Sequence, residues 1–312
     1  MIEDPVVSFI VPLYNYEQYV GLAIQSILDQ SIQQLEIIVI DDASTDGSRE
    51  VIRRFSDPRI RLYINERNMG QGWTSERGIT HARGEFVVYL DADDWIDQRK
   101  TELQLDFFRN NPDVDIVSTY ATAVDADGNR HPSAAEFEGW TNRPLDFNVI
   151  DTWIVRCLVT GSVMIRRAAH QRVGLRDETM ILADYEFWTR ALRYGCRFGL
   201  IPAPLLMRRR HEKNLSYADP MRAFVELTYA MRKNLMPIVQ TRARLHLVGA
   251  IIGWVTTHQQ FLLMSEPEQY RMLGLLLSQI ERMPFSAFNR AIFSQDDTEL
   301  LGLGKHFYEA IA

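Results

Sequence analysis

Short apolar runs alternate with longer amphipathic stretches over the first ninety residues of the chain. The runs have the length and the β-branched content of buried strands, and they cover residues 6–12, 35–40, 59–64 and 86–90. The stretches between them carry apolar residues at helical spacing and end in turn or cap residues. Regular alternation of strand and helix implies right-handed crossovers and a sheet with helices on both faces. We therefore expect an α/β domain with a mostly parallel sheet flanked by helices.

The pattern changes to helices alone beyond Asp219. Apolar side chains recur there at helical spacing, and we interpret these stripes as packing faces: Phe224, Leu227, Met231 and Leu235, then Val248, Ile251, Val255 and Leu262. The sequence thus predicts an α/β domain over residues 1–218 and an all-helical C-terminal region over residues 219–312. We expect the C-terminal region to serve acceptor binding, oligomerisation or membrane proximity.

Composition narrows the class of protein. The chain has 312 residues, is 46% hydrophobic and 24% charged, and carries a formal net charge of −7, which argues against a nucleic-acid binder. Its two cysteines, Cys157 and Cys196, form neither a disulfide framework nor a zinc motif, so a reducing, cytoplasmic setting is expected. The first residues lack a signal-peptide pattern, and residues 245–265, the longest stretch without Asp, Glu, Lys or Arg, are too polar for a membrane span.

Polar residues follow three of the predicted parallel strands. Tyr14 and Asn15 come after the first strand, Asp42 after the second, and Asp91 after the fourth. Ligands of open α/β sheets bind beyond the carboxyl ends of the strands, so we expect these side chains to converge on one site. The chain has no glycine-rich dinucleotide fingerprint after the first strand and no phosphate-binding loop motif, so neither a dinucleotide cofactor nor a P-loop ATPase is indicated.

Three carboxylates within four residues, Asp91, Asp93 and Asp94, point to a cation. Oxygen ligands on a short turn suit Mg²⁺ or Mn²⁺, and Mg²⁺ usually completes its octahedron with waters and substrate phosphate oxygens. The cluster therefore predicts a diphosphate-bearing substrate. The alternative is an Asx-turn and a cap for the helix beginning near Gln98.

Four motifs together resemble family 2 glycosyltransferases of the GT-A fold: residues 8–15, 40–48, 68–70 and 90–94, within a similarity that extends over residues 6–217. The resemblance implies an inverting, metal-dependent glycosyltransferase that uses Mg²⁺ or Mn²⁺ and acts in polysaccharide or glycoconjugate synthesis. Its donor would be a nucleotide-diphospho-sugar, with a UDP- or dTDP-sugar expected, and its acceptor a sugar or a lipid-linked molecule.

The resemblance also assigns roles to individual residues. Pro12 and Tyr14 would line the base pocket, Asp42 would bind the base, Asp91 would touch the ribose, and Asp93 would hold the metal. The structural alternatives are strand-end punctuation for Pro12, a core aromatic for Tyr14 and helix capping for the aspartates.

Two segments depart from the family pattern. Where the family reads Ala-Arg-Asn-x-Gly-Ile, residues 74–79 read Thr-Ser-Glu-Arg-Gly-Ile, so the arginine comes two positions late. Arg77 would bind the nucleotide, or else be a surface helix charge. The family's Glu-Asp pair reads Ala183-Asp184, which keeps Asp184 as the general base for the acceptor hydroxyl, with a helix cap as the alternative.

A basic segment, residues 208–213, follows the last predicted strand. Its Arg209-x-His211 pattern, with Asn214 and Ser216 after it, resembles the family segment that closes over the diphosphate, and His211 would stabilise the leaving group. A solvated basic turn, or a patch for peripheral contact with an anionic membrane surface, is the alternative.

Two other functions compete with the glycosyltransferase hypothesis. A nucleotidyltransferase also combines an α/β sheet with acidic metal ligands, but it would usually need a basic glycine-rich loop after the first strand, where residues 12–16 read Pro-Leu-Tyr-Asn-Tyr. A non-catalytic sugar-nucleotide-binding protein stays open because Ala183 replaces the family's glutamate.

Overall fold

The computed structural model describes residues 4–177, 179–211, 219–239, 241–278 and 283–294. The chain forms two compact units. The first comprises Met1–Asn148, Arg156–Glu178 and Tyr194–Asn214, and the second comprises Val149–Val155, Thr179–Arg193 and Leu215–Ala312.

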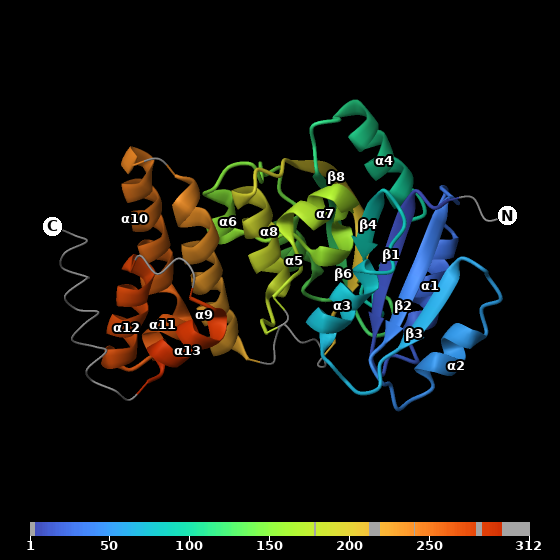
Figure 1. The fold of residues 1–312 in the computed structure, drawn as a ribbon, viewed down its shortest axis with the longest axis horizontal. Coiled ribbons are helices and arrows are strands. Elements are labelled where there is room, and N and C mark those ends of the chain that lie inside the picture. Colours follow the sequence, from blue (N-terminus) through green and yellow to red (C-terminus); the bar gives the residue numbers. More distant parts are fainter. Residues whose placement is uncertain (1–3, 178, 212–218, 240, 279–282, 295–312) are drawn as a thin grey trace. The chain divides into compact units, whose positions relative to one another are not determined.

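A mixed eight-stranded sheet forms the centre of the first unit (Figure 1). The strand order is β3-β2-β1-β4-β7-β6-β8-β5. The strands are β1 Val7–Leu13, β2 Leu35–Asp41, β3 Ile60–Ile64, β4 Phe86–Tyr89, β5 Trp95–Ile96, β6 Ile116–Val124, β7 Met164–Arg166 and β8 Phe198–Arg209. Strands β3, β2, β1 and β4 are parallel, whereas β7 runs antiparallel to both β4 and β6. The predicted α/β class is confirmed.

Helices cover both faces of the parallel half of this sheet. Side chains on one face, such as Phe9 and Val11, form a common core with α1 (Val20–Leu28), α2 (Ser48–Arg53) and α4 (Lys100–Asn110). The other face carries α3 (Gln71–Ile79) and α7 (Arg167–Val173). Gly78 allows the close approach of α3, because a Cβ there would lie 2.3 Å from Cγ2 of Ile10. Burial on both faces explains why β1 and β2 read as continuous apolar runs.

Strands β6 and β8 are each longer than their sequence suggests. The pattern predicts two short strands separated near Tyr120, and another two separated near Pro202. In the structure the first pair forms the single strand β6 and the second pair the single strand β8. The parallel register between β6 and β8 shifts near Tyr120 and Pro204. Proline cannot donate a ladder hydrogen bond, so an irregular register here breaks the period-two pattern without ending the strand. Helix α5 (Ala134–Thr141) packs against β6.

The second unit is helical throughout its described residues. It contains α6 (Thr152–Val155), α8 (Ala183–Arg193), α9 (Pro220–Ala230), a π-helical turn (Met231–Leu235), a 3₁₀ turn (Met236–Ile238), α10 (Thr241–Thr257), α11 (Gln259–Leu263), α12 (Glu266–Leu277) and α13 (Phe285–Ile292). Trp153, Trp188 and Phe224 are almost completely buried in it. Side chains cap some of these helices: Asp219 accepts the Arg222 N–H at the start of α9, and Ser265 and Glu268 form a capping box on α12.

The second unit includes residues that precede the predicted boundary at residue 218. Residues Val149–Val155 and Thr179–Arg193 belong to it together with the C-terminal helices. The separate roles of residues 1–218 and 219–312 stay a prediction. None of the helices in the described part of the chain combines the length and apolar character needed to cross a bilayer. Asn214 and Ser216 lie outside the described residues.

Candidate active site

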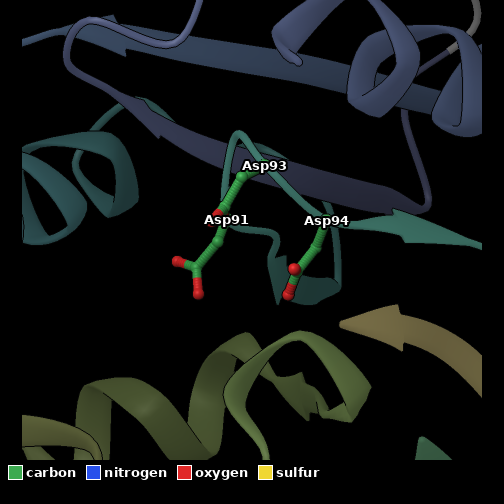
Figure 2. Close-up of side chains that lie close together, drawn as sticks. All are labelled: Asp91, Asp93 and Asp94. Carbon is green, nitrogen blue, oxygen red and sulfur yellow. The ribbon is translucent and has the colours of Figure 1, made fainter. Parts of the chain in front are cut away.

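The acidic turn, Asp91–Asp94, lies between β4 and β5 at the carboxyl end of the parallel strands. Ligand oxygens of Asp91, Asp93 and Asp94 all lie within 4.8 Å of one another. The turn is closed by the Asp94 N–H, which donates to the Asp91 carbonyl at 3.1 Å. Figure 2 shows the side chains of Asp91 and Asp94 extending to the same side of this turn. Three carboxylates are thus held on one short, rigid segment.

Mutual repulsion makes this cluster electrostatically costly. Burial, together with the charges of Asp93 and Asp91, raises the pKa of the Asp94 carboxyl well above its ordinary value. Asp94 is 3% exposed, and its Oδ1 accepts the backbone N–H of Arg209 at 2.8 Å. A cation at the turn would offset the repulsion, so the donor set fits the predicted metal.

His211 meets the acidic turn directly. Its Nε2 lies 2.9 Å from Oδ2 of Asp93. The imidazole stacks on the ring of Tyr19, with centroids 5.7 Å apart, and contacts the edge of Tyr16 at 5.9 Å. Burial and the nearby carboxylates, Asp93 first, raise the pKa of the Tyr16 hydroxyl, which keeps it neutral. The structure therefore brings together Asp93 and His211, two of the predicted site residues.

Arg209 holds the acidic turn in place, a role that sequence reasoning missed. Its side chain is buried, and its Nε donates to the Asp93 carbonyl at 2.9 Å. Its other donations go to the carbonyls of Asp125 and Ala126, at 2.8 and 2.6 Å. The guanidinium also lies over the Tyr19 ring, 4.4 Å from its centroid. The Arg209 guanidinium therefore binds backbone carbonyls of the protein. The similarity of its segment to a loop that closes over a diphosphate did not indicate this structural role.

Asp42 anchors the loop that follows β3. It is 3% exposed, and its Oδ1 accepts from Asn65 Nδ2 at 2.6 Å and from the Met69 N–H at 2.8 Å. Its Oδ2 accepts the Gly70 N–H at 2.8 Å. Arg77 reaches the same network, because it donates to the Ile64 carbonyl at 3.1 Å and to Oδ1 of Asn65. Asp42 and Arg77 thus share one hydrogen-bonded cluster, and their nucleotide-binding roles stay predictions.

The remaining donor-site candidates lie at the ends of β1 and β4. Pro12 is buried within β1, opposite Ile40 of β2. Tyr14 is 43% exposed, so the alternative of a core aromatic is wrong for this residue. Asp91 is partly exposed and accepts from Nε2 of Gln71 at 2.9 Å. The strand register places Tyr14, Asp42 and Asp91 at the carboxyl ends of the parallel strands, as predicted, and their convergence on one ligand stays a prediction.

Asp184 belongs to the second unit, in the first turn of α8. Its Oδ1 accepts the N–H of Tyr185 at 2.8 Å. This bond to the next residue differs from an N-cap, whose side chain accepts from the second or third helical N–H. The assignment of Asp184 as general base stays a prediction.

A model of the family described as "Glycosyl transferase family 2" matches residues 8–174, which is more than half of the chain. The chain is 28% identical over 213 residues to an uncharacterized glycosyltransferase of Methanocaldococcus jannaschii, covering 66% of this chain and 71% of that protein. It is 37% identical over 110 residues to the UDP-Glc:alpha-D-GlcNAc-diphosphoundecaprenol beta-1,3-glucosyltransferase WfgD of Escherichia coli. That match covers 35% of this chain and 43% of WfgD, so the chain spans less than half of this second relative.

Solved structures share the fold. The crystal structure of S. aureus TarS 1-349 in complex with UDP-GlcNAc matches with a TM-score of 0.69 and 17% identity, covering 97% of this chain and 88% of that chain. The mannosyltransferase PcManGT from Pyrobaculum calidifontis, in complex with GDP-Man and Mn²⁺, matches with a TM-score of 0.54 and 18% identity, covering 97% and 87%.

Fold and family match together define a glycosyltransferase with the GT-A fold. The chain belongs to glycosyl transferase family 2. The predicted family is thereby confirmed, and the nucleotidyltransferase alternative gains no support.

Proposed function

We propose that the protein is an inverting glycosyltransferase that moves a sugar from a nucleotide-diphospho-sugar to an acceptor hydroxyl in polysaccharide or glycoconjugate synthesis. The observation that carries the proposal is the gathering of Asp91, Asp93 and Asp94 at the ligand-binding edge of the sheet. Relatives support it, since WfgD is named for UDP-Glc and a diphosphoundecaprenol-linked acceptor. TarS and PcManGT were solved with UDP-GlcNAc and GDP-Man. A UDP- or dTDP-sugar is the donor we expect here.

The acidic turn would hold Mg²⁺ or Mn²⁺, with Asp93 as the main protein ligand. Its donor atoms are carboxylate oxygens alone, which these hard cations prefer, and PcManGT was solved with Mn²⁺. When bound, the metal would supply neutralisation of the charge that develops on the departing diphosphate. Asp93 and Asp94 are buried, so water would screen less of the attraction between their carboxylates and a bound cation.

The chain's own residues would divide the remaining work. Asp184 would take the proton of the acceptor hydroxyl, which is too weak an acid to attack unaided. His211, held beside the acidic turn by Asp93 and Tyr19, would donate to the diphosphate. Pro12 and Tyr14 would line the base pocket.

Three further proposed contacts concern the nucleotide. Asp42 would bind the base, and Asp91 would contact the ribose. Arg77 would contact the nucleotide, and its position beside Asp42 is fixed by the hydrogen bonds that both residues make with Asn65. The cytoplasmic setting, with or without peripheral membrane contact, is likewise a prediction.

A panel of UDP-glucose, UDP-N-acetylglucosamine, dTDP-glucose and GDP-mannose tests the proposal in two assays. Thermal shift with Mn²⁺ measures binding, and a ligand at 100 times its dissociation constant should stabilise the protein by about 2.7 kcal/mol. Slow hydrolysis of the best-bound sugar nucleotide, abolished by EDTA, is the expected sign of an enzyme. Binding without any hydrolysis would favour the non-catalytic alternative, and no binding to any member would contradict the proposal.

A further inference from the structure

Glu226 of α9 is a buried carboxylate that reaches across to the start of α8. The side chain is fully buried, and its Oε1 and Oε2 accept the backbone N–H groups of Ile181 and Leu182 at 3.0 and 2.7 Å. Arg222, one turn earlier on α9, donates Nε to the same carboxylate at 2.9 Å. All three bonds lie within the second unit.

These two N–H groups lie immediately before α8, which begins at Ala183. The first N–H groups of a helix have no intrahelical acceptor and carry the positive end of the helix dipole. Asp184 lies after them, in the first turn of α8, and its Oδ1 accepts from Tyr185. Glu226 therefore performs from another helix the capping that a local side chain usually provides.

The C-terminal helices hold α8 on the other side of Asp184 as well. Glu186 is fully buried, and its Oε1 accepts from Nζ of Lys233 at 2.9 Å. Asn234 donates Nδ2 to the backbone carbonyl of Glu186 at 3.1 Å. The turn that carries Asp184 is thus fixed both before and after it, by residues of α9 and of the π-helical turn that follows α9.

Burial of a carboxylate at this position costs desolvation free energy, which a purely structural contact would not require. Burial raises the pKa of the Glu226 carboxyl, against the lowering effect of its backbone and Arg222 donors. Buried ion pairs are weak evidence for stability, because apolar side chains of similar volume often serve as well. What the carboxylate adds is direction, since two acceptor oxygens fix the orientation of two consecutive peptide groups.

We propose that Glu226 is a positioning residue for the transfer reaction, which sets the orientation of Asp184 through the peptide groups of Ile181 and Leu182. The inference rests on the proposed role of Asp184 as general base. Glu226 is fully buried, so its proposed role is positional and not catalytic. The C-terminal helical region therefore takes part in the chemistry indirectly, by holding the turn that presents the base.

The first test compares full-length Glu226→Gln with wild type in the hydrolysis of whichever member of the sugar-nucleotide panel reacts fastest with Mn²⁺. Glutamine keeps the size but offers one acceptor oxygen, and its NH₂ group faces a backbone N–H. We expect kcat to fall by roughly tenfold to a hundredfold, as when a catalytic group is misplaced by about 1 Å, while KM for the donor stays within about twofold. An unchanged kcat, or a KM that rises in step with the loss of kcat, overturns the proposal.

Thr228→Val is the matched control on the same helix. The buried Thr228 hydroxyl donates to the Phe224 carbonyl at 3.0 Å, a bond that lies entirely within α9. The control should lose stability without the fall in kcat, and an equal fall in both variants at equal loss of melting temperature overturns the proposal. If Glu226→Gln does not fold, Arg222→Gln carries the test. It leaves the Glu226 carboxylate in place, removes the Arg222 bonds to Glu226 and to the Thr179 carbonyl, and should lower kcat in the same direction by a smaller factor.

A double variant separates this inference from the proposal on which it rests. If Glu226 acts through Asp184, adding Glu226→Gln to Asp184→Asn should reduce kcat no further. Independent, multiplicative losses overturn the inference and leave the base assignment standing. If Asp184→Asn alone leaves hydrolysis and transfer intact, the assignment of the base fails instead.

Discussion

His211 Nε2 lies 2.9 Å from Asp93 Oδ2, although 118 positions separate the two residues in the chain. The contact joins the turn after β4 to the residues after β8, and Tyr19 stacks on the imidazole from the loop before α1. The imidazole and the carboxylate thus lie together at the carboxyl end of the parallel strands, where the diphosphate and its metal are proposed to bind. Asp93 is consequently the residue whose removal should be most informative.

Asp93→Ala should abolish metal-dependent binding of the donor and leave the fold intact. The substitution removes one of the three carboxylates of the cluster, and the proposed metal would lose its main protein ligand. Calorimetry of UDP binding with Mn²⁺ and with EDTA measures the effect. Asp113→Asn is the control, since it removes a 79% exposed carboxylate that precedes β6, at the amino end of the parallel strands. Unchanged UDP affinity with Mn²⁺ in Asp93→Ala would refute the metal assignment.

Asp184→Asn should reduce transfer by roughly a hundredfold or more, the usual contribution of a positioned general base. Donor affinity and melting temperature should stay close to wild type, because asparagine retains the size of the side chain and an oxygen that can accept the Tyr185 N–H. Donor hydrolysis, donor binding and thermal unfolding are measured on the same sample. A variant that melts much lower yet keeps its turnover would show that Asp184 is structural.

Arg209→Met should destabilise the first unit. The substitution leaves the carbonyls of Asp93, Asp125 and Ala126 without their charged donor in a buried place. We expect the free energy of unfolding to fall by about 2 to 4 kcal/mol, measured by urea denaturation. Arg99→Met is the control, because Arg99 is 64% exposed and pairs with Glu102 at 3.4 Å, so its loss should cost under about 1 kcal/mol. Equal effects of the two substitutions would contradict the role of Arg209.

Lys100→Met should change how stability depends on pH. Burial lowers the pKa of Lys100 from 10.5 to about 7, and its Nζ donates only to Gln104 Oε1, at 3.0 Å, among the described residues. Between these two pKa values the unfolded chain binds one more proton than the folded chain, so stability rises with pH over this window. Below pH 7 both states are protonated and the full cost of burying the charge remains.

The variant should therefore be more stable than wild type at pH 7, with the difference shrinking as pH rises toward 10. Urea denaturation of both proteins at pH 7, 8, 9 and 10 measures this difference, and comparison with wild type cancels the titration of all other groups. A difference that stays constant across the series would show that Lys100 has an ordinary pKa in the fold.

The sequence by itself determined those features that depend on neighbours along the chain. Strands β1, β2 and β4 could be predicted because strands buried on both faces are short apolar runs, and Tyr14, Asp42 and Asp91 could be placed at one edge because parallel strands end on the same side. The carboxylate cluster was visible for the same reason, since its three members lie within four positions.

Only the tertiary structure decided the contacts made across the chain. The bond of Asp93 with His211, the clamping of the acidic turn by Arg209 and the capping of α8 by Glu226 each join residues more than 40 positions apart. Local periodicity and propensity carry no information on such pairs, because they arise from strand order, register and helix packing. A buried arginine or glutamate reads in sequence as a surface charge, and only its partners in the fold show that it holds a loop or a helix in place.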